Sequence, residues 1–138
     1  MSSGAKPPAD RQPAVLKLEL PAEPHLLPVI RHLDQAFASS LAVPEAKVTE
    51  ILLAVHEACS NVVVHAYGEE GGALHLQASR DLHQLVVQVS DSGTPVANPE
   101  SRPGAGLGLR IIRAVCDEVD IEGPGEYGTR LEMTFRLG

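Results

Sequence analysis

The sequence contains few aromatic side chains. It has no tryptophan, and aromatic residues make up 3% of its 138 residues. Proteins that bind single-stranded nucleic acid stack bases on such side chains, so base stacking is not expected here. With 43% hydrophobic residues, the core must be packed mainly from Leu, Val, Ile and Ala.

Cysteine is scarce as well. The two cysteines, Cys59 and Cys116, each lie within an apolar helical pattern, and they form no CxxC spacing. Isolated cysteines in such patterns indicate reduced core residues rather than a disulfide or a metal site.

The sequence also lacks an excess of positive charge and a long apolar run. A net charge of −7 and a pI near 5.3 give a field that repels nucleic acid and anionic membranes. A phosphate site would therefore have to be local, built from Gly-rich backbone, a metal or individual arginines. The charge therefore predicts no nucleic-acid partner and no membrane partner. Because the sequence has no apolar run of about 18 residues and no charged-then-apolar leader, we also expect a cytoplasmic location.

The length and the pattern of apolar residues predict one folded domain. Residues 1–13 are expected to form a flexible tail and residues 14–138 the domain. The expected elements are a strand at 14–20, helices at 24–41 and 48–67, strands at 73–79 and 82–90, a helix at 107–119, and strands at 119–122 and 129–137. Because the helices do not alternate with single strands, this order favours an α+β two-layer sandwich over a doubly wound sheet.

The helix at 48–67 has two distinct faces. Glu57 and Asn61 lie one turn apart, opposite the apolar stripe, so their side chains project together. Apolar neighbours at 53, 54, 58 and 64 predict that something other than water covers this pair, although a solvated surface pair is the common alternative. The stripes expected to be buried are Val48, Ile51, Leu52, Val55, Cys59, Val62 and Ala66 here, and Leu26, Leu27, Ile30, Leu33, Phe37 and Leu41 in the preceding helix.

Three short segments carry chemistry that fits a nucleotide. They are Glu57-x-x-x-Asn61, Asp91-x-Gly93 at a strand end, and Gly104-x-Gly106-Leu107-Gly108-Leu109, where a long loop becomes a helix. Glycines before a helix N-terminus let the backbone approach a phosphate. The Asn oxygen suits Mg²⁺, Glu57 can accept a proton, and Asp91 can accept a hydrogen bond from an amino group such as that of adenine.

Together, the order and placement of these segments resemble the nucleotide-binding superfamily shared by gyrase, Hsp90, sensor histidine kinases and the DNA-repair protein MutL. Residues 57–67 (EACSNVVVHAY), 91–93 (DSG) and 106–110 (GLGLR) are most similar to the small bacterial anti-sigma-factor serine kinases. The resemblance covers about residues 14–138. It implies a mixed, mostly antiparallel sheet covered on one face by helices.

The resemblance also implies an activity and partners. ATP and Mg²⁺ would be the cofactors of a serine/threonine-protein kinase. The protein would act as an anti-sigma factor that binds a sigma factor and phosphorylates a STAS-type anti-anti-sigma protein. It could also form a homodimer. A nucleotide-gated binding module without kinase activity is the alternative, and a sensor histidine kinase fragment with His32 as acceptor is a third.

Roles for individual residues follow from the same resemblance. Glu57 would act as the base on the acceptor hydroxyl, or would activate water as in related ATPases, and Asn61 would hold Mg²⁺. A lid arginine would assist at the terminal phosphate, and both Arg102 and Arg110 are candidates. The remaining contacts would be Asp91 to adenine, Gly93 along the ring, Thr129 beside the base, and Gly104, Gly106, Leu107 and Gly108 around the phosphates.

Overall fold

The computed structural model describes residues 14–40, 43–67, 71–93, 105–125 and 128–137. The predicted tail, residues 1–13, lies outside this part of the chain. In chain order, the elements are β1 (Ala14–Pro21), the 3₁₀ turn η2 (Pro24–Leu26), α1 (Leu27–Ser40), α2 (Glu45–Asn61), the π-helical turn η3 (Val62–Ala66), β2 (Ala73–Arg80), β3 (Gln84–Asp91), α3 (Ala105–Val115), β4 (Glu118–Gly125) and β5 (Gly128–Arg136). None of the helices among these elements is long and apolar enough to cross a bilayer.

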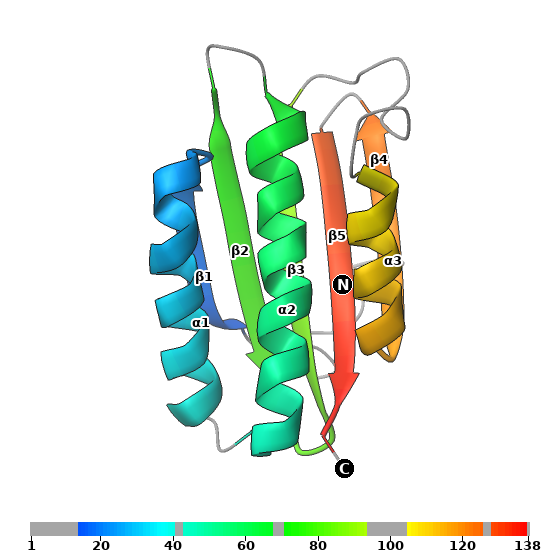
Figure 1. The fold of residues 1–138 in the computed structure, drawn as a ribbon. Coiled ribbons are helices and arrows are strands. Elements are labelled where there is room, and N and C mark those ends of the chain that lie inside the picture. The colour runs from blue at the N-terminus through cyan, green and yellow to red at the C-terminus, as the bar shows by residue number, and fades with distance from the viewer. Residues whose placement is uncertain (1–13, 41–42, 68–70, 94–104, 126–127, 138) are drawn as a thin grey trace, which may run out of the picture.

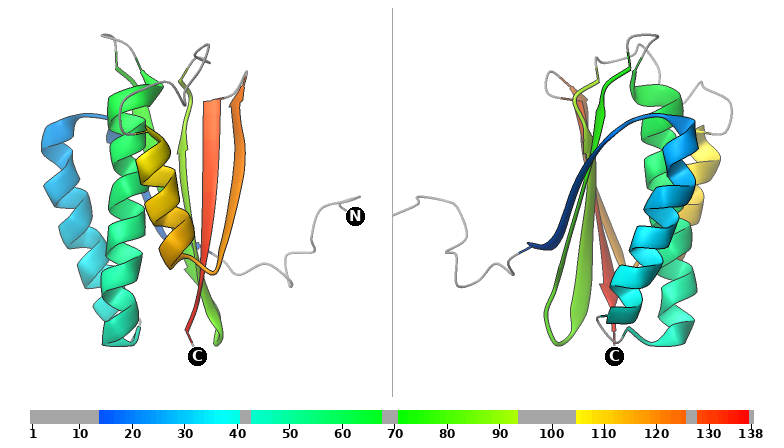
Figure 2. Two further views of the ribbon diagram at one scale, coloured as in Figure 1. Left: turned by 45° about the vertical axis from the view of Figure 1, so that its right-hand side comes forward. Right: turned by 90° about the vertical axis from the view of Figure 1, so that its left-hand side faces the viewer.

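The strands form one sheet with the order β1-β2-β3-β5-β4. All four pairings are antiparallel, so the described sheet has no parallel pair, although a mixed sheet was expected. The three helices lie on one face of the sheet (Figure 2). The predicted α+β two-layer sandwich is confirmed, and the other face of the sheet has no helix over it within the described residues.

Alternation along the strands places the core between sheet and helices. In β2 and β3, every second residue is buried, and the intervening residues point to the open face. The open-face positions are mainly polar, as the cross-strand pair of Gln77 and Gln88 illustrates. The largest fully buried side chains are Phe135, Leu74, Leu76, Leu85, Ile112, Met133, Val55 and Cys59.

The central helix differs from its prediction at its C-terminal end. The regular α-helix stops at Asn61, and the next five residues wind as the π-helical turn η3. Three consecutive valines occupy this turn, and β-branched side chains crowd a regular helix. Such π-helical turns are frequent at functional sites, and this one directly follows Asn61.

The buried stripe of α1 also differs from its prediction. Ile30, Asp34 and Ala38 are buried, whereas Leu33 is 38% exposed. Asp34 makes no hydrogen bond or ion pair within the described part of the chain. Burial raises its pKa from 3.8 to about 7, and its charge adds to the burial that raises the pKa of the Cys59 thiol. An acidic side chain therefore interrupts an apolar helix interface.

The last helix ends earlier than predicted. α3 stops at Val115, and Val119 lies in β4 rather than at a helix end. The N–H of Asp117 donates to Thr134 O over 2.9 Å, and the Asp117 carboxylate accepts the N–H of Arg136 over 2.6 Å. These contacts with β5, which is distant in sequence, end the helix where the local pattern would continue it.

Asp34 should make stability depend on pH. Because its pKa is raised in the folded state, the folded protein loses stability as pH rises from about 4 to about 7, by at most about 4 kcal/mol. We expect Asp34→Asn to be more stable than the wild type at pH 8 and to lose little stability over this range. Urea unfolding at pH 5, 6, 7 and 8 measures this, with the exposed-site variant Asp120→Asn as control. Identical pH profiles for wild type and Asp34→Asn would contradict the assignment.

Candidate functional site

Four chain segments meet at one end of the domain. The C-terminal end of α2 with η3, the end of β3, the beginning of α3 and the beginning of β5 all lie at the upper end in Figure 1. The three segments singled out from the sequence belong to these elements. The topology therefore brings together residues that are as far apart in sequence as Glu57 and Thr129.

Glu57 and Asn61 lie on the flank of α2 that faces α3. Both side chains are half-buried, and Ala54 and Ala58 beside them are buried. A Cβ atom on Gly108 would lie 3.1 Å from Asn61 Oδ1, 3.2 Å from Asn61 Nδ2 and 3.4 Å from Glu57 Oε2. The first turn of α3 is therefore the cover that the apolar neighbours predicted for this pair.

Part of the face around the pair differs from its prediction. All four apolar neighbours were expected to lie under a cover, but the side chains of Leu53 and Val64 are 42% and 61% exposed. Ala54 and Ala58 are buried as expected. The cover therefore does not extend to Leu53 and Val64.

Asp91 is the last residue of β3 and one of the few buried polar side chains. It points to the helix side of the sheet, and its Oδ1 accepts the N–H of Gly93 over 2.9 Å. Burial raises the pKa of Asp91, and the backbone N–H groups of Gly93 and Thr129 oppose that rise. Thr129 is also its cross-strand partner in β5. Asp91 and Thr129, which the resemblance assigns to the base, are thus neighbours.

Two glycines allow close backbone packing around Asp91. A Cβ atom on Gly93 would lie 2.0 Å from the carbonyl oxygen of Ala66 in η3. A Cβ atom on Gly128 would lie 2.1 Å from the carbonyl oxygen of Asp91, and Gly128 has a φ of +91°. In the sequence, Gly128 lies in the segment between the two predicted strands at 119–122 and 129–137 and was not predicted to belong to the site. Its position immediately before Thr129 was the one signal that could have marked it.

The glycine-rich segment forms the N-terminus of α3. The helix begins at Ala105, two residues earlier than predicted, so Gly106, Leu107 and Gly108 lie in its first turn. Backbone N–H groups of a first turn lack helical partners and favour an anion. Arg102 and Gly104 lie outside the described residues. Arg110 is exposed on α3.

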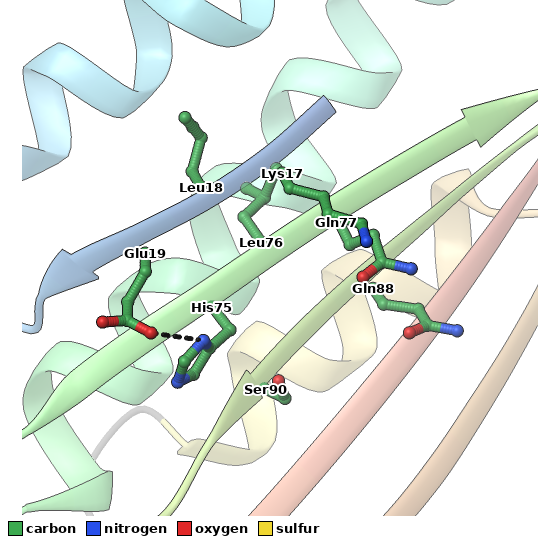
Figure 3. Close-up of a pocket in the computed structure, with 8 residues that line it drawn as sticks. All are labelled: Lys17, Leu18, Glu19, His75, Leu76, Gln77, Gln88 and Ser90. Carbon is green, nitrogen blue, oxygen red and sulfur yellow. Dashed lines mark ion pairs between the residues drawn. The ribbon is translucent and has the colours of Figure 1, made fainter. Parts of the chain in front are cut away.

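A hollow of about 320 Å³ lies on the other face of the sheet. Side chains of β1, β2 and β3 line it, and within it His75 Nδ1 is 3.4 Å from Glu19 Oε1 (Figure 3). None of the residues predicted from the sequence to form the site lines this hollow. The sheet separates it from the Glu57–Asn61 pair, so it is not part of the candidate site.

Fold and site together define a class of protein. It is a two-layer α+β domain in which an acidic strand end, a Glu/Asn helix and a glycine-containing helix start lie at the same end of the domain. The family model of the histidine kinase-like ATPase domain matches residues 20–135, which are most of the chain. The chain belongs to this family.

Curated relatives are identical to this chain at about a quarter of the aligned residues. The anti-sigma F factor of Clostridium acetobutylicum is 28% identical over an alignment of 109 residues, and the match covers 71% of this chain and 76% of that protein. The serine-protein kinase RsbW of Bacillus velezensis is 27% identical over 138 residues, with 88% of this chain and 85% of that protein covered. The similarity to anti-sigma kinases expected from the motifs is thus confirmed.

Solved structures share the fold. The structure of the RsbU and RsbW domains of Rv1364c from Mycobacterium tuberculosis matches with a TM-score of 0.71 and 20% identity. The match covers 91% of this chain and 32% of that one. The SiaB–SiaC complex from Pseudomonas aeruginosa matches with a TM-score of 0.70 and 16% identity over 91% of both chains.

Two of the closely packed glycines of the site, Gly93 and Gly108, should respond differently to alanine. Gly93→Ala places a Cβ against backbone, and we expect it to destabilise the protein by about 2 kcal/mol or more. Gly108→Ala meets only side-chain ends, and the gain in helix propensity of up to about 1 kcal/mol should offset the crowding. Urea denaturation of both variants measures the difference. Equal losses of stability would contradict this description of the packing.

Proposed function

We propose that this chain binds ATP with Mg²⁺ at the candidate site and transfers the terminal phosphate to a serine or threonine hydroxyl of an anti-anti-sigma protein of the STAS type. We also propose that the chain binds a sigma factor. The state of the bound nucleotide would then decide whether the chain forms a complex with the sigma factor or with the anti-anti-sigma protein. The observation that carries the proposal is the contact of the α3 first turn with Glu57 and Asn61. It places a helix N-terminus, whose free N–H groups favour an anion, beside a carboxylate and an amide.

The adenine base of ATP would lie at the Asp91 end of the site. The Asp91 carboxylate is buried, and the N–H of Gly93 orients one of its oxygens. When ionised, it would accept a hydrogen bond from the exocyclic amine of adenine. Gly93, two residues further along the chain, would line the ring with its backbone. Thr129, the cross-strand partner of Asp91, would lie beside the base.

The phosphates would lie at the start of α3. Backbone N–H groups around Gly106 and Gly108 would bind phosphate oxygens, as at other helix N-termini. Asn61 Oδ1 would be one Mg²⁺ ligand, and most other ligands would come from phosphates and water because Glu57 and Asn61 supply too few for an octahedral ion. Bound Mg²⁺ would neutralise charge that develops on the transferred phosphate.

Glu57 would accept the proton of the hydroxyl group that is phosphorylated. The hydroxyl oxygen of the partner's serine or threonine attacks the terminal phosphorus, and the bond to the bridging oxygen breaks with its electron pair leaving on ADP. The hydroxyl proton moves to the Glu57 carboxylate, which is half-buried on the helix flank beside Asn61. An arginine at the terminal phosphate, Arg102 or Arg110, completes the proposal.

The partners are proposed from the relatives. Two similar proteins are named an anti-sigma F factor and a serine-protein kinase, and one solved structure of this fold is a two-protein complex. These names support a protein partner that carries the acceptor hydroxyl. They also support a sigma factor as the second partner.

Transfer of labelled phosphate from MgATP to STAS-type proteins of the same genome tests the proposal. Glu57→Gln should slow transfer about 100-fold or more while ATP still binds, because only the proton acceptor is lost. Asn61→Ala should weaken ATP binding as well. Glu50→Gln, the same change two turns earlier in α2, should alter neither and serves as control.

The outcome separates the proposed function from its alternatives. An acid-stable label on the partner that depends on Glu57 fits phosphoserine or phosphothreonine. Saturable ATP binding without any transfer would contradict the kinase and leave a nucleotide-gated binding protein. An acid-labile label would indicate a phosphohistidine and contradict the assigned acceptor.

A further inference from the structure

The side chain of Tyr67 joins three segments beside Asp91. Tyr67 directly follows η3 and has an extended backbone. Its hydroxyl donates to the carbonyl oxygen of Ala73 in β2 over 2.6 Å and accepts the N–H of Ser92, just after β3, over 2.8 Å. One hydroxyl group thus links the end of the central helix to two strand ends.

The hydroxyl occupies the place of a strand pair. The β2–β3 ladder ends with the pair Leu74 and Asp91, and the next pair in register would be Ala73 and Ser92. The carbonyl of Gly72 accepts the N–H of Ala22 on the β1 side, so the carbonyl of Ala73 faces β3. Instead of bonding to each other, the Ala73 carbonyl and the Ser92 N–H both bond to Tyr67. The hydroxyl therefore holds the two strands apart at this point.

The ring of Tyr67 packs directly against the backbone of Gly72. A Cβ atom on Gly72 would lie 2.1 Å from Cε1 of the ring, so the glycine provides the space for it. The residue before Tyr67, Ala66, packs its carbonyl oxygen against Gly93. Ser92 lies between Asp91 and Gly93, the two residues proposed to contact the base.

We infer that Tyr67 is the positioning residue for base recognition: its hydroxyl fixes the direction in which the chain leaves β3, and so orients Asp91 and Gly93 toward the base. This inference rests on the proposed ATP site. Tyr67 itself contacts backbone and does not need to touch the nucleotide. Without the hydroxyl, Ala73 and Ser92 would be free to pair directly, which would draw Ser92 toward β2 and turn Asp91 with it.

The preference for ATP over GTP reports the orientation of Asp91. Guanine carries a carbonyl oxygen where adenine carries its exocyclic amine, so a carboxylate placed there accepts a hydrogen bond only from adenine. We expect Tyr67→Phe, which keeps the ring, to reduce the ratio of MgATP to MgGTP affinity about tenfold, as for one misplaced hydrogen bond. Calorimetric titration with each nucleotide measures the ratio.

Two accompanying measurements separate positioning from general destabilisation. Amide hydrogen exchange at Ser92 should become faster in Tyr67→Phe, because its N–H loses its acceptor. Phe135→Leu changes a buried side chain at the opposite end of the sheet from Asp91. It should destabilise the protein without changing the nucleotide preference or the exchange at Ser92. A loss of preference in Phe135→Leu equal to that in Tyr67→Phe would overturn the inference.

A second variant reaches the same hydroxyl from another direction. Gly72→Ala places a methyl group against the ring and should displace it, with the same loss of preference as Tyr67→Phe. This variant gives the answer if Tyr67→Phe does not fold. Unchanged ATP preference in the folded variants would overturn the inference.

The Asp91→Asn variant distinguishes the inference from the function on which it rests. If Asp91→Asn loses the ATP preference while Tyr67→Phe and Gly72→Ala keep it, the proposed base site stands and the role of Tyr67 is overturned. If the wild type binds neither nucleotide, both fall. Loss of preference in all three variants supports the inference.

Discussion

The rest of the site depends on the close approach of α3 to α2. At Gly108 the distance is so short that an added methyl group would press on Asn61 and Glu57. This contact buries one side of a polar pair that would otherwise be solvated, and it directs the first turn of α3 along the pair. After α3, β5 enters the sheet beside β3, and this pairing places Thr129 next to Asp91.

The polar end of the domain is built at some cost to its packing. Asp91 occupies an inward position of β3 where Val89, Val87 and Leu85 continue the core, and its burial disfavours the charged form. Backbone N–H groups limit this cost, and Gly93 and Gly128 bring them close. Natural proteins depart from simple core rules mainly at functional or strained sites, and buried Asp91 is such a departure where the proposed nucleotide would lie.

Local patterns predicted most of the elements, their order and the three site segments, because apolar periodicity and glycine placement are local signals. They did not predict features set by contacts distant in sequence. Asp34 is buried in α1 where the apolar pattern favoured Leu33, and Asp117 ends α3 through its bonds to β5. The bridging role of the Tyr67 hydroxyl depends on the β2–β3 register, which no local pattern specifies.

The central claim is that ATP binds on the helix side of the sheet, between α2, α3 and the end of β3. The most direct test is a titration of the labelled protein with MgATP, followed through its amide resonances. The account predicts saturable shifts at Gly93, Gly108 and Thr129, with little change at His75, Gln77 and Gln88 around the open-face hollow. Shifts confined to the open face, with the helix-side amides unchanged, would contradict it.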